Sequence, residues 1–399
     1  MSSRSDMRPL EGIKVLDLSR VLAGPTATAV LGDLGCDVIK IENPDGGDET
    51  RGWGPPWAGT ESAYYLSANR NKRSLTLNLK HPEGIKIVER ILKDSDVVIL
   101  NFPGKRIEKL GFTYDWAKKI KPDIIWANIS GFGLTGPKKD LPGYDILIQG
   151  MSGLMSVTGE ADGGPVKVGV AVADVFTALY TVIAILAALK RRTDTGEGTA
   201  IDNSLYECMT SALVNVANNY LIGGLVPKRF GTAHPNIVPY QAFKASDIHI
   251  IVGVGNDRQF REFSGILGRP EWADDERFSS NALRVKNRRV LLPLIEAEIS
   301  KRTADEWTLL LEEKEIPVAP INTMDRTFSD EQFGARGFIQ TVPHVSGEIK
   351  LMKNPIHFSD MDTSIYRAPP TLGEHTEEIL AQYGYSPEDI LRLKKDNAI

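Results

Sequence analysis

One apolar stretch limits what this chain can fold into more than any other part of it. Residues 163–192 read GGPVKVGVAVADVFTALYTVIAILAALKRR and hold a single acidic residue, Asp174. A carboxylate in such a run loses its hydration, which costs free energy. It is therefore expected only where an interaction partner or a function requires it. The stretch therefore predicts a core helix that carries one functional acid and ends at Lys190, Arg191 and Arg192, near its negative end.

Two interpretations of Asp174 remain open at this stage. In the first, Asp174 is the N-cap of a helix that begins at Val175, since Asp is a preferred N-cap residue. In the second, the helix start supplies N–H groups and a positive dipole end, so the acid stays ionised while it is shielded from water. The second environment suits a nucleophile.

The same stretch approaches the roughly 20 apolar residues that a membrane span requires. Asp174 inside it, its many Ala and Gly residues and the lack of a second candidate oppose that interpretation. A core helix is expected instead.

Composition excludes several classes of protein. The 399 residues carry a net charge of -5, which argues against nucleic-acid or anionic-membrane binding as a main role. Two cysteines, Cys36 and Cys208, form no disulfide framework and suit a reducing compartment. The start, MSSRSDMRPL, lacks the apolar region of a signal peptide, so a cytoplasmic protein is expected.

The first third of the chain alternates between strand and helix patterns. Residues 12–42 read as a βαβ unit in which Gly24-Pro25 opens the helix. The alternation continues to about residue 130 through the strand patterns SLTLNL, DVVILNF and DIIWANIS. It predicts an α/β fold with a mainly parallel sheet.

A dinucleotide site is a natural hypothesis for such a unit, because Glu42 ends the second strand where a ribose-binding acid would stand. The glycine fingerprint is missing from the first turn. The later Gly253 and Gly255 follow a strand pattern, but Arg258 occupies the third glycine position. NAD binding is therefore disfavoured.

The remaining segments differ in character. Residues 45–75 are rich in Gly, Pro and Trp and end in the basic run 69–73, which is either part of a functional loop or a solvated loop face. Helical patterns dominate 144–223, with a turn near 195–198. After Gly224 come short strands, charged helices and a capping box, Thr303 to Glu306.

Several common catalytic motifs are absent from the sequence. It contains no Walker loop, no H-E-x-x-H, no C-x-x-C and no G-x-S-x-G. Its six histidines lack metal-ligand spacing, so no metal site is expected. The remaining features are an isolated carboxylate, Gly-rich turns and basic loops. They suit acyl transfer on a phosphorylated carrier whose phosphates are held by strand ends and helix N-termini.

Several long motifs carry a family resemblance that spans residues 9–395. They are PLEGIKVLDLSRVLAGPTAT, LGDLGCDVIKIENPDGGDETRGWG, YYLSANRNKRSLTLNLK, PGYDILIQGMSGLMSVTG, GVAVADVFTALY, GTAHPNIVPYQAF and RAPPTLGEHT. With them the chain resembles the class III coenzyme A transferases, the CaiB/BaiF or formyl-CoA transferase-like family. Within that family it is most similar to members that use succinyl-CoA and a dicarboxylate such as glutarate.

The resemblance implies a fold and an assembly. It implies an α/β protein with a Rossmann-like large domain built from both ends of the chain and a smaller α+β domain between them. The expected limits are 1–224 for the first part of the large domain with its connecting helices, 225–325 for the small domain and 326–399 for the return. It also implies an interlaced, ring-like homodimer.

The resemblance further implies covalent catalysis by Asp174, which occupies the family's catalytic position in the run A-D-x-x-T-A-L-Y. Asp174 would attack an acyl-CoA to form a mixed anhydride and CoA thiolate, and the thiolate would then form an aspartyl-CoA thioester. No permanent cofactor is implied, because CoA is a substrate. Tyr144, Asp145 and Arg70 are expected near the substrate or just behind it.

CoA contacts carry over only where this sequence matches the family. The matching residues are Val21, Leu22, Ala23, Leu77, Lys80, Asn101, Phe102 and Lys109. Asn43 replaces a basic residue, NFPG is one residue shorter than usual, and Leu141-Pro142 precede GYD where a cation is common. These departures affect the adenosine-phosphate contacts.

Two rival functions are weighed against CoA transfer. An α-methylacyl-CoA racemase would have the motif GHD, but here Tyr144 replaces its histidine, and an ordinary Tyr pKa near 10 makes a poor base. A non-catalytic acyl-CoA-binding dimer would not need Asp174. The sequence has no run of several consecutive glycines like that of the oxalate-using members, which argues against oxalate as a substrate. We expect succinyl-CoA as donor and a dicarboxylate such as glutarate or malate as acceptor. Arg70 or Arg229 is the expected partner of its distal carboxylate.

Overall fold

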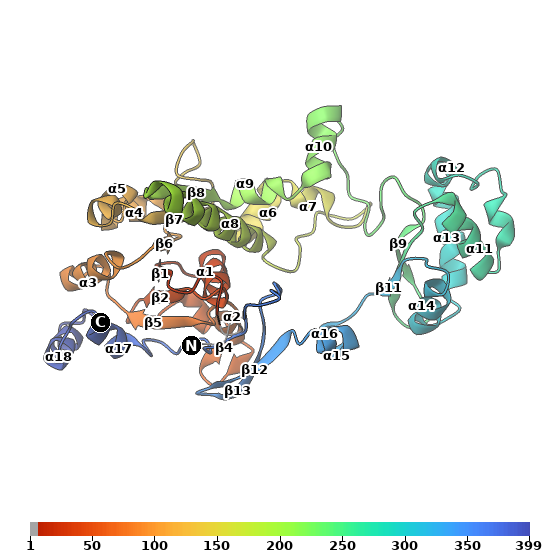
Figure 1. Ribbon diagram of the computed structural model, residues 1–399. Coiled ribbons are helices and arrows are strands. Elements are labelled where there is room, and N and C mark those ends of the chain that lie inside the picture. Colours follow the sequence, from red (N-terminus) through yellow and green to blue (C-terminus); the bar gives the residue numbers. More distant parts are fainter. Residues whose placement is uncertain (1–6) are drawn as a thin grey trace. The chain divides into compact units, whose positions relative to one another are not determined.

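A six-stranded parallel sheet forms the centre of the first part of the chain (Figure 1). The computed structural model describes residues 7–399, with the backbone alone at Arg106. The sheet order is β5 (Lys72–Thr76), β2 (Asp37–Glu42), β1 (Lys14–Asp17), β6 (Val97–Leu100), β7 (Ile125–Ser130) and β8 (Thr199–Ser204). The predicted α/β class with a mainly parallel sheet is confirmed. The strand order reverses between β1 and β6, the point where open α/β sheets bind ligands.

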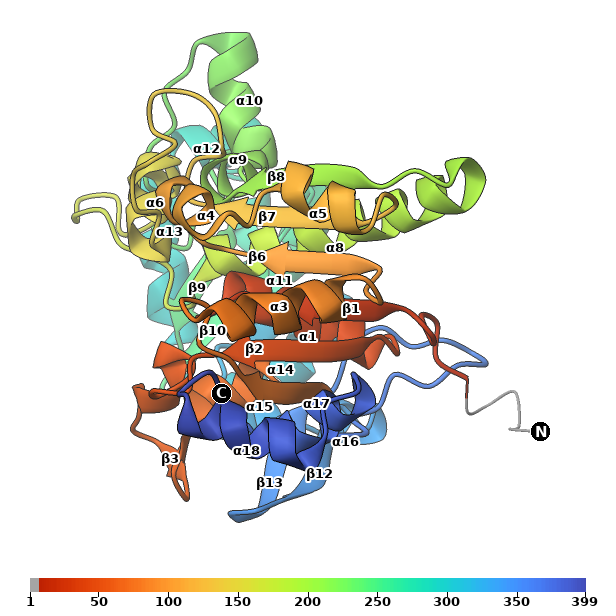
Figure 2. The ribbon, with the colours of Figure 1, turned by 90° about the vertical axis from the view of Figure 1, so that its left-hand side faces the viewer.

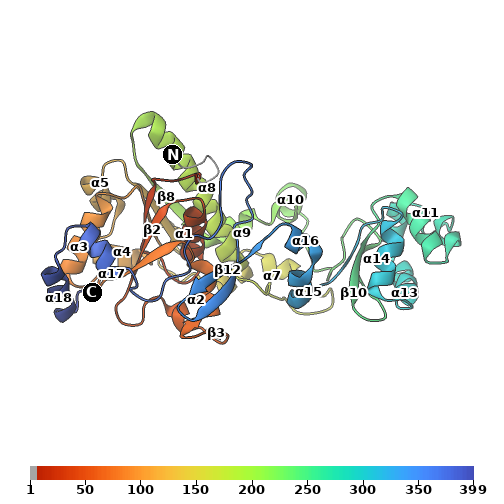
Figure 3. The same cartoon turned by 60° about the horizontal axis from the view of Figure 1, so that its bottom comes forward.

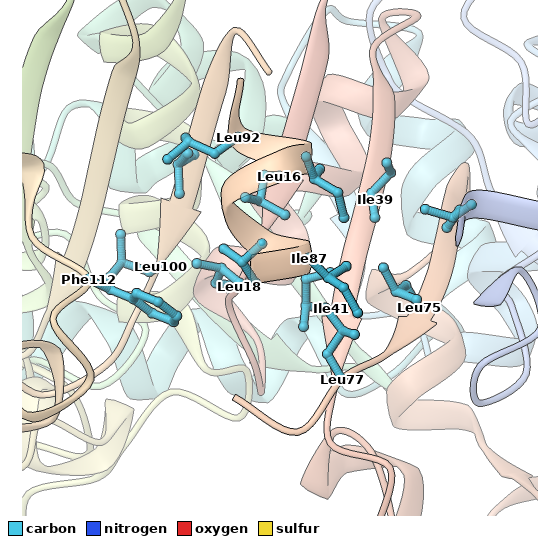
Figure 4. Close-up of a cluster of buried hydrophobic side chains, with 14 of the residues drawn as sticks. Leu16, Leu18, Ile39, Ile41, Leu75, Leu77, Ile87, Leu92, Leu100 and Phe112 are labelled. Atoms are coloured by element: carbon cyan, nitrogen blue, oxygen red, sulfur yellow. The ribbon is translucent and has the colours of Figure 1, made fainter. Parts of the chain in front are cut away.

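Alternating side chains of each strand enter two separate cores, because successive residues of a strand point to opposite faces. Leu16 packs with α3 (Pro82–Leu92), whereas Val15 packs with α1 (Ala23–Asp33). Figure 2 shows α3 in front of the strands and α8 behind them. Figure 4 shows Ile87 and Leu92 of α3 over Leu16, Ile39 and Leu75.

Four shorter helices complete the α3 face of the sheet. They are α4 (Gly104–Leu110), α5 (Tyr114–Ile120), α17 (Thr376–Gln382) and α18 (Pro387–Lys395). The last two come from the C-terminal end of the chain, so this core joins segments about 300 residues apart in sequence.

The acid-bearing apolar stretch forms the long helix α8 (Val172–Thr195), which ends at Gly196 with a left-handed φ of 71°. Ala178, Val182 and Ile185 of α8 enter the second core together with Ala27 and Leu31 of α1. By length and composition alone α8 would reach across a membrane. Its packing against α1 and the sheet agrees with the predicted core helix.

The strand β8 corrects one prediction. Residues 144–223 were expected to be helical with a single turn, yet Thr199–Ser204 pairs with β7 along its whole length. Its sequence, TAIDNS, has no apolar run, because β8 is the edge of the sheet and alternate side chains are exposed.

The chain divides into two compact units. The first contains the sheet and extends through Leu154, then Lys167–Gly223 and Gly334–Ile399; the second contains Met155–Val166 and Gly224–Phe333. The second unit holds the antiparallel strands β9 (Tyr240–Lys244), β10 (His249–Gly253) and β11 (Val318–Pro320). Its larger helices are α11 (Asp257–Ile266), α13 (Arg288–Ile299) and α14 (Ala304–Glu312), grouped in Figure 3.

An aromatic core holds the second unit together. Phe243, Phe260, Phe263, Phe278 and Trp307 pack there with the helices. The predicted capping box is confirmed: the Thr303 hydroxyl accepts the Glu306 N–H, and the Glu306 carboxylate accepts the Thr303 N–H.

The remaining elements are short. They are η2 (Glu49–Gly52), β3 (Trp57–Ala58), β4 (Glu61–Ser62), α2 (Ala63–Ala68), α6 (Asp145–Met151), α7 (Leu154–Val157), α9 (Leu205–Ser211), α10 (Val214–Gly223), η3 (Pro270–Ala273), α12 (Asn281–Lys286), α15 (Met324–Ser329), α16 (Glu331–Ala335), β12 (Ile339–His344) and β13 (Gly347–Met352).

Candidate active site

A cleft of ≈ 1130 Å³ opens where β1, β2, β5 and β6 end. Four of the residues expected to contact CoA line it together: Leu77, Lys80, Phe102 and Lys109. Leu77 and Phe102 are buried side chains of the first core, while the two lysines bring positive charge. The cleft thus combines apolar surface with cations at the switch point of the sheet.

The other four expected contacts do not line the cleft, but they adjoin Arg20, which does. Val21, Leu22 and Ala23 follow Arg20, which lines the cleft, and α1 begins at Ala23. The Asn101 carboxamide accepts the Arg20 N–H at 3.0 Å and donates to the Arg20 carbonyl at 2.7 Å. Asn101 therefore fixes the backbone that leads into α1.

Asp174 lies in the first turn of α8 and is partly exposed. The N-cap interpretation is wrong, since Ala171 is the N-cap and Asp174 is the third helical residue. Burial, together with the nearby charge of Asp145, raises the pKa of Asp174 to about 7. Both causes oppose the ionised state that was expected for this acid at the helix start.

Asp145 and Gln149 of α6 hold the start of α8 in place. An Asp145 oxygen accepts the Ala173 N–H at 2.9 Å, so Asp145 satisfies a free donor of the α8 start. The Gln149 amide donates to Asp145 at 2.7 Å and to the Val170 carbonyl at 3.2 Å, and it accepts the Val168 N–H at 2.9 Å. The carboxylates of Asp145 and Asp174 are thereby kept near each other.

Two glycines bring Asp145 to this position. Gly131 follows β7 and Gly143 precedes the Tyr144–Asp145 pair, and a Cβ on Gly143 would lie 2.1 Å from the Gly131 Cα. The two backbones can touch only without side chains. The loop between them therefore closes at α6, and Tyr144 stays 66% exposed beside it.

Tyr64 of α2 was not among the site residues expected from the sequence. Burial and the charges of Asp174 and Asp145 raise the pKa of Tyr64, which places its hydroxyl in the electrostatic field of both acids. Its ring meets Trp53 edge to face, with centroids 5.1 Å apart. The Gly, Pro and Trp content of 45–75 pointed to this loop, but nothing in the pattern distinguished Tyr64 from its neighbours.

The basic run 69–73 is not a solvated loop face. Asn69, Asn71 and Lys72 are at most 1% exposed, and Arg73 is 5% exposed. Arg70 donates to both Asp33 oxygens, at 3.0 and 2.6 Å. The guanidinium of Arg70 is therefore already paired at the end of α1.

The other candidates are also engaged. Glu42 lines the cleft but accepts from both Arg51 and Ser74, which leaves little capacity for a ribose. Arg229, in the second unit, donates to the carbonyls of Glu160 and Gly163. Within residues 7–399, no three His, Cys, Asp or Glu side chains are grouped as a metal site.

Comparison with known proteins gives one consistent result. The profile described as CoA-transferase family III matches residues 10–376. A mouse protein named succinyl-CoA:glutarate CoA-transferase is 44% identical over 96% of this chain and 88% of its own length. A succinate--glutarate CoA-transferase of Agrobacterium fabrum is also 44% identical, over 94% of this chain and 95% of its own. A crystal structure of a CAIB/BAIF family protein from Brucella suis superimposes with a TM-score of 0.88 at 45% identity, covering 94% and 99% of the two chains.

Proposed function

Because the chain belongs to CoA-transferase family III and is a CoA-transferase, we propose that it moves CoA from succinyl-CoA to a dicarboxylic acid such as glutarate. Relatives of similar identity from mouse and from a bacterium bear names with this pair of substrates. The observation that carries the proposal is the position of Asp174 on the first turn of α8, where within the described residues it has no cationic partner.

The proposed chemistry uses Asp174 as the nucleophile. Its carboxylate oxygen attacks the thioester carbonyl of succinyl-CoA, the C–S bond breaks, and CoA leaves as a thiolate, so that an aspartyl-succinyl anhydride forms. The thiolate attacks the aspartyl carbonyl of the anhydride and releases succinate. Glutarate then attacks the aspartyl-CoA thioester, and the steps run in reverse to give glutaryl-CoA and free Asp174.

The raised pKa of Asp174 supports this role for two reasons. An environment that disfavours the charged acid has little water to hydrolyse an anhydride or a thioester. At a pH above about 7 the acid is the carboxylate that the first step requires. Tyr64 and Tyr144 flank the site, and we propose that they position the acyl group.

We place the nucleotide part of CoA in the cleft beside β1, β2, β5 and β6. Lys80 and Lys109 match the charge of its phosphates, and the backbone at Leu77 and Phe102, whose side chains belong to the first core, lines the same cleft. The free N–H groups at the start of α1 suit a phosphate or a carbonyl oxygen.

The exposed apolar surface supports an interlaced homodimer. Leu221 and Ile222 of α10 are 74% and 85% exposed, and Leu225 and Val226 after it are 69% and 72% exposed. Such a contiguous apolar segment marks a protein interface. We propose that a second copy covers it, and that this dimer functions in a reducing compartment such as the cytoplasm, in keeping with the free thiols of Cys36 and Cys208.

The acceptor-binding residue is a separate proposal. Since Asp33 already pairs with Arg70, we assign the distal carboxylate to Arg229, whose present partners are two neutral carbonyls. Arg229→Met is expected to raise the KM for glutarate, with less effect on the KM for succinyl-CoA. Equal changes in the two constants would contradict this assignment.

Intact-mass spectrometry tests the mechanism. After brief incubation with succinyl-CoA, the wild type should gain the mass of a covalent CoA or succinyl adduct, and Asp174→Ala should gain none. Exchange of the substrate α-proton in heavy water is measured in parallel. Exchange without an adduct would show racemase-type proton transfer and reject the transferase mechanism.

A further inference from the structure

The turn between β1 and α1 contains a strained residue beside the cleft. Val21 has a φ of 68°, in the left-handed region that β-branched residues rarely occupy. Such strain persists only where the surroundings impose it, and it is frequent at functional sites. The groups that impose it at Val21 can be identified.

An ion pair holds both sides of this turn. Lys40 and Asp48 lie 3.0 Å apart, and their side chains are 0% and 1% exposed. The Lys40 ammonium donates to the Ser19 carbonyl at 2.9 Å, and both Asp48 oxygens accept the Val21 N–H at 3.2 Å. The pair thus binds one backbone group before Arg20 and one after it.

Three further contacts make this arrangement rigid. Thr50 donates its N–H and its hydroxyl to Asp48, at 3.1 and 2.8 Å. Gly24 lets the first turn of α1 approach Ser19, whose side chain a Cβ at this position would meet at 2.2 Å. Asn101 binds both backbone groups of Arg20.

A buried ion pair is weak support for stability by itself, because desolvation offsets the attraction between its charges. Here the pair acts on the backbone that leads into α1. In the described part of the chain, the N–H groups of Leu22 and Ala23 have no hydrogen-bond partner. They are available to a ligand in the cleft only while the turn keeps its shape.

We propose that Lys40 and Asp48 are positioning residues for CoA binding: they hold the strained turn at Val21, so that the backbone at the start of α1 is ready for the CoA thioester. The inference rests on the proposed location of CoA in the cleft. Lys40 and Asp48 line the cleft, but their side chains are 0% and 1% exposed, so the function we assign them is to shape the backbone rather than to contact the substrate.

The test measures the Kd of CoA, the KM of each substrate, kcat and the melting temperature for Asp48→Ala and Lys40→Met. Each variant is expected to raise the Kd of CoA and the KM of succinyl-CoA about tenfold, with kcat and the KM of glutarate within about twofold. Asp48→Asn keeps one acceptor oxygen and should retain more affinity than Asp48→Ala. It also replaces Asp48→Ala if that variant does not fold.

A second substitution separates positioning from general stability. Val21→Gly removes the cost of the left-handed φ, so the double variant with Asp48→Ala should recover part of the lost CoA affinity. Glu298→Gln is the matched control. It removes the negative charge of a side chain in the second unit that accepts hydrogen bonds from Arg269 and Lys301. It should lower the melting temperature without changing the Kd of CoA.

Two results would overturn the inference. If Asp48→Ala and Lys40→Met lower the melting temperature but leave the Kd of CoA within about twofold, while Lys80→Ala and Lys109→Ala weaken binding, the pair is only structural. If Lys80→Ala and Lys109→Ala have no effect either, CoA binds elsewhere, and the proposed site fails together with the inference.

Discussion

The floor of the cleft and the start of α8 each contain an acid that burial affects, but the pKa is lowered in the first and raised in the second. Burial disfavours the charge of Asp48, yet Lys40 and the Thr50 donors outweigh it and hold the pKa of Asp48 below its ordinary value. Asp174 is partly buried, but among residues 7–399 it has no ion-pair partner, and Asp145 adds a second negative charge. Pairing with a cation therefore lowers the pKa of Asp48, whereas the pKa of Asp174 is raised, and a strongly raised pKa is typical of functional sites.

The largest expected effect is the loss of the unpaired acid. Asp174→Asn should lower kcat by about 10⁴-fold, because the proposed mechanism has no other nucleophile to form the covalent intermediate. The free energy of unfolding should stay the same or rise, since an unpaired acid is removed from a partly buried site. Single-turnover kinetics and urea unfolding measure the two quantities. Substantial residual adduct formation would reassign the nucleophile.

The second prediction breaks a buried ion pair at the end of β1. Lys72 and Asp17 are both fully buried and lie 3.4 Å apart, and Lys72→Met leaves Asp17 without this cation. We expect the free energy of unfolding to fall by about 3–5 kcal/mol, as for other buried pairs that lose one partner. Urea denaturation followed by circular dichroism gives the value.

The double variant Lys72→Met with Asp17→Asn is the control for that measurement. It also removes the negative charge of Asp17, which Lys40 alone would then face in Lys72→Met, so it should recover part of the lost stability. If the double variant is less stable than Lys72→Met, the Asp17 contacts with Ser19 and Thr28 matter more than its pairing with Lys72.

The pH profile sharpens the contrast at Asp174. Since the pKa of Asp174 is about 7 in the folded protein, kcat/KM for succinyl-CoA should rise with pH through about 7 as the carboxylate forms. The folded pKa lies above the ordinary 3.8, so this group stabilises the fold most at low pH. That contribution is lost as the pH rises from about 4 to about 7.

Asp145→Asn tests the cause of that profile. It keeps an oxygen for the Ala173 N–H but removes the negative charge, which should move the acid limb down by about half a pH unit or more. The acid limb is measured from kcat/KM between about pH 5 and 9, a range that brackets the pKa of Asp174. An unchanged limb would mean that burial alone sets the pKa of Asp174.

Features with local causes could be predicted from the sequence, and features that depend on distant segments could not. The strands β1, β2, β6 and β7 follow from apolar runs, and Asp174 stood out because a single acid interrupts an apolar helix. The edge strand β8 lacks such a run and was missed. Sequence patterns report burial on both faces of a strand better than pairing at an edge.

The errors at the site have a tertiary origin. Asp174 was a reasonable N-cap by local rules, but Asp145, 28 residues before Ala173, supplies the carboxylate that binds the helix start. Likewise, Lys72 and Arg73 have a loop-like sequence but are buried against Asp17 and Asp37. Tyr64 joins the site through packing that no spacing reveals. Such contacts between distant segments lie beyond a single-sequence pattern.

The smallest expected effect concerns a buried polar group that is neither paired nor reactive. Asn128 of β7 is 1% exposed, and neither its amide oxygen nor its nitrogen has a partner in the described part of the chain. A cavity of ≈ 270 Å³ adjoins it, so a side chain of similar size fits there. Asn128→Leu should therefore raise the free energy of unfolding by about 1 kcal/mol.

Asn354 is the matched control for this last prediction. It is 2% exposed, but its amide nitrogen donates to Asp33 at 3.2 Å and its oxygen accepts the Ile356 N–H at 2.9 Å. Asn354→Leu leaves the Ile356 N–H without its acceptor and removes one donor from Asp33, which keeps Arg70 and Asn71, so it should lower the free energy of unfolding by about 1–3 kcal/mol. Opposite signs for the two variants in urea unfolding would show that pairing, rather than burial, decides the energetic effect of a polar side chain in this core. Equal losses would mean that ordered water satisfies Asn128, and the comparison between paired and unpaired groups would then hold only for charges.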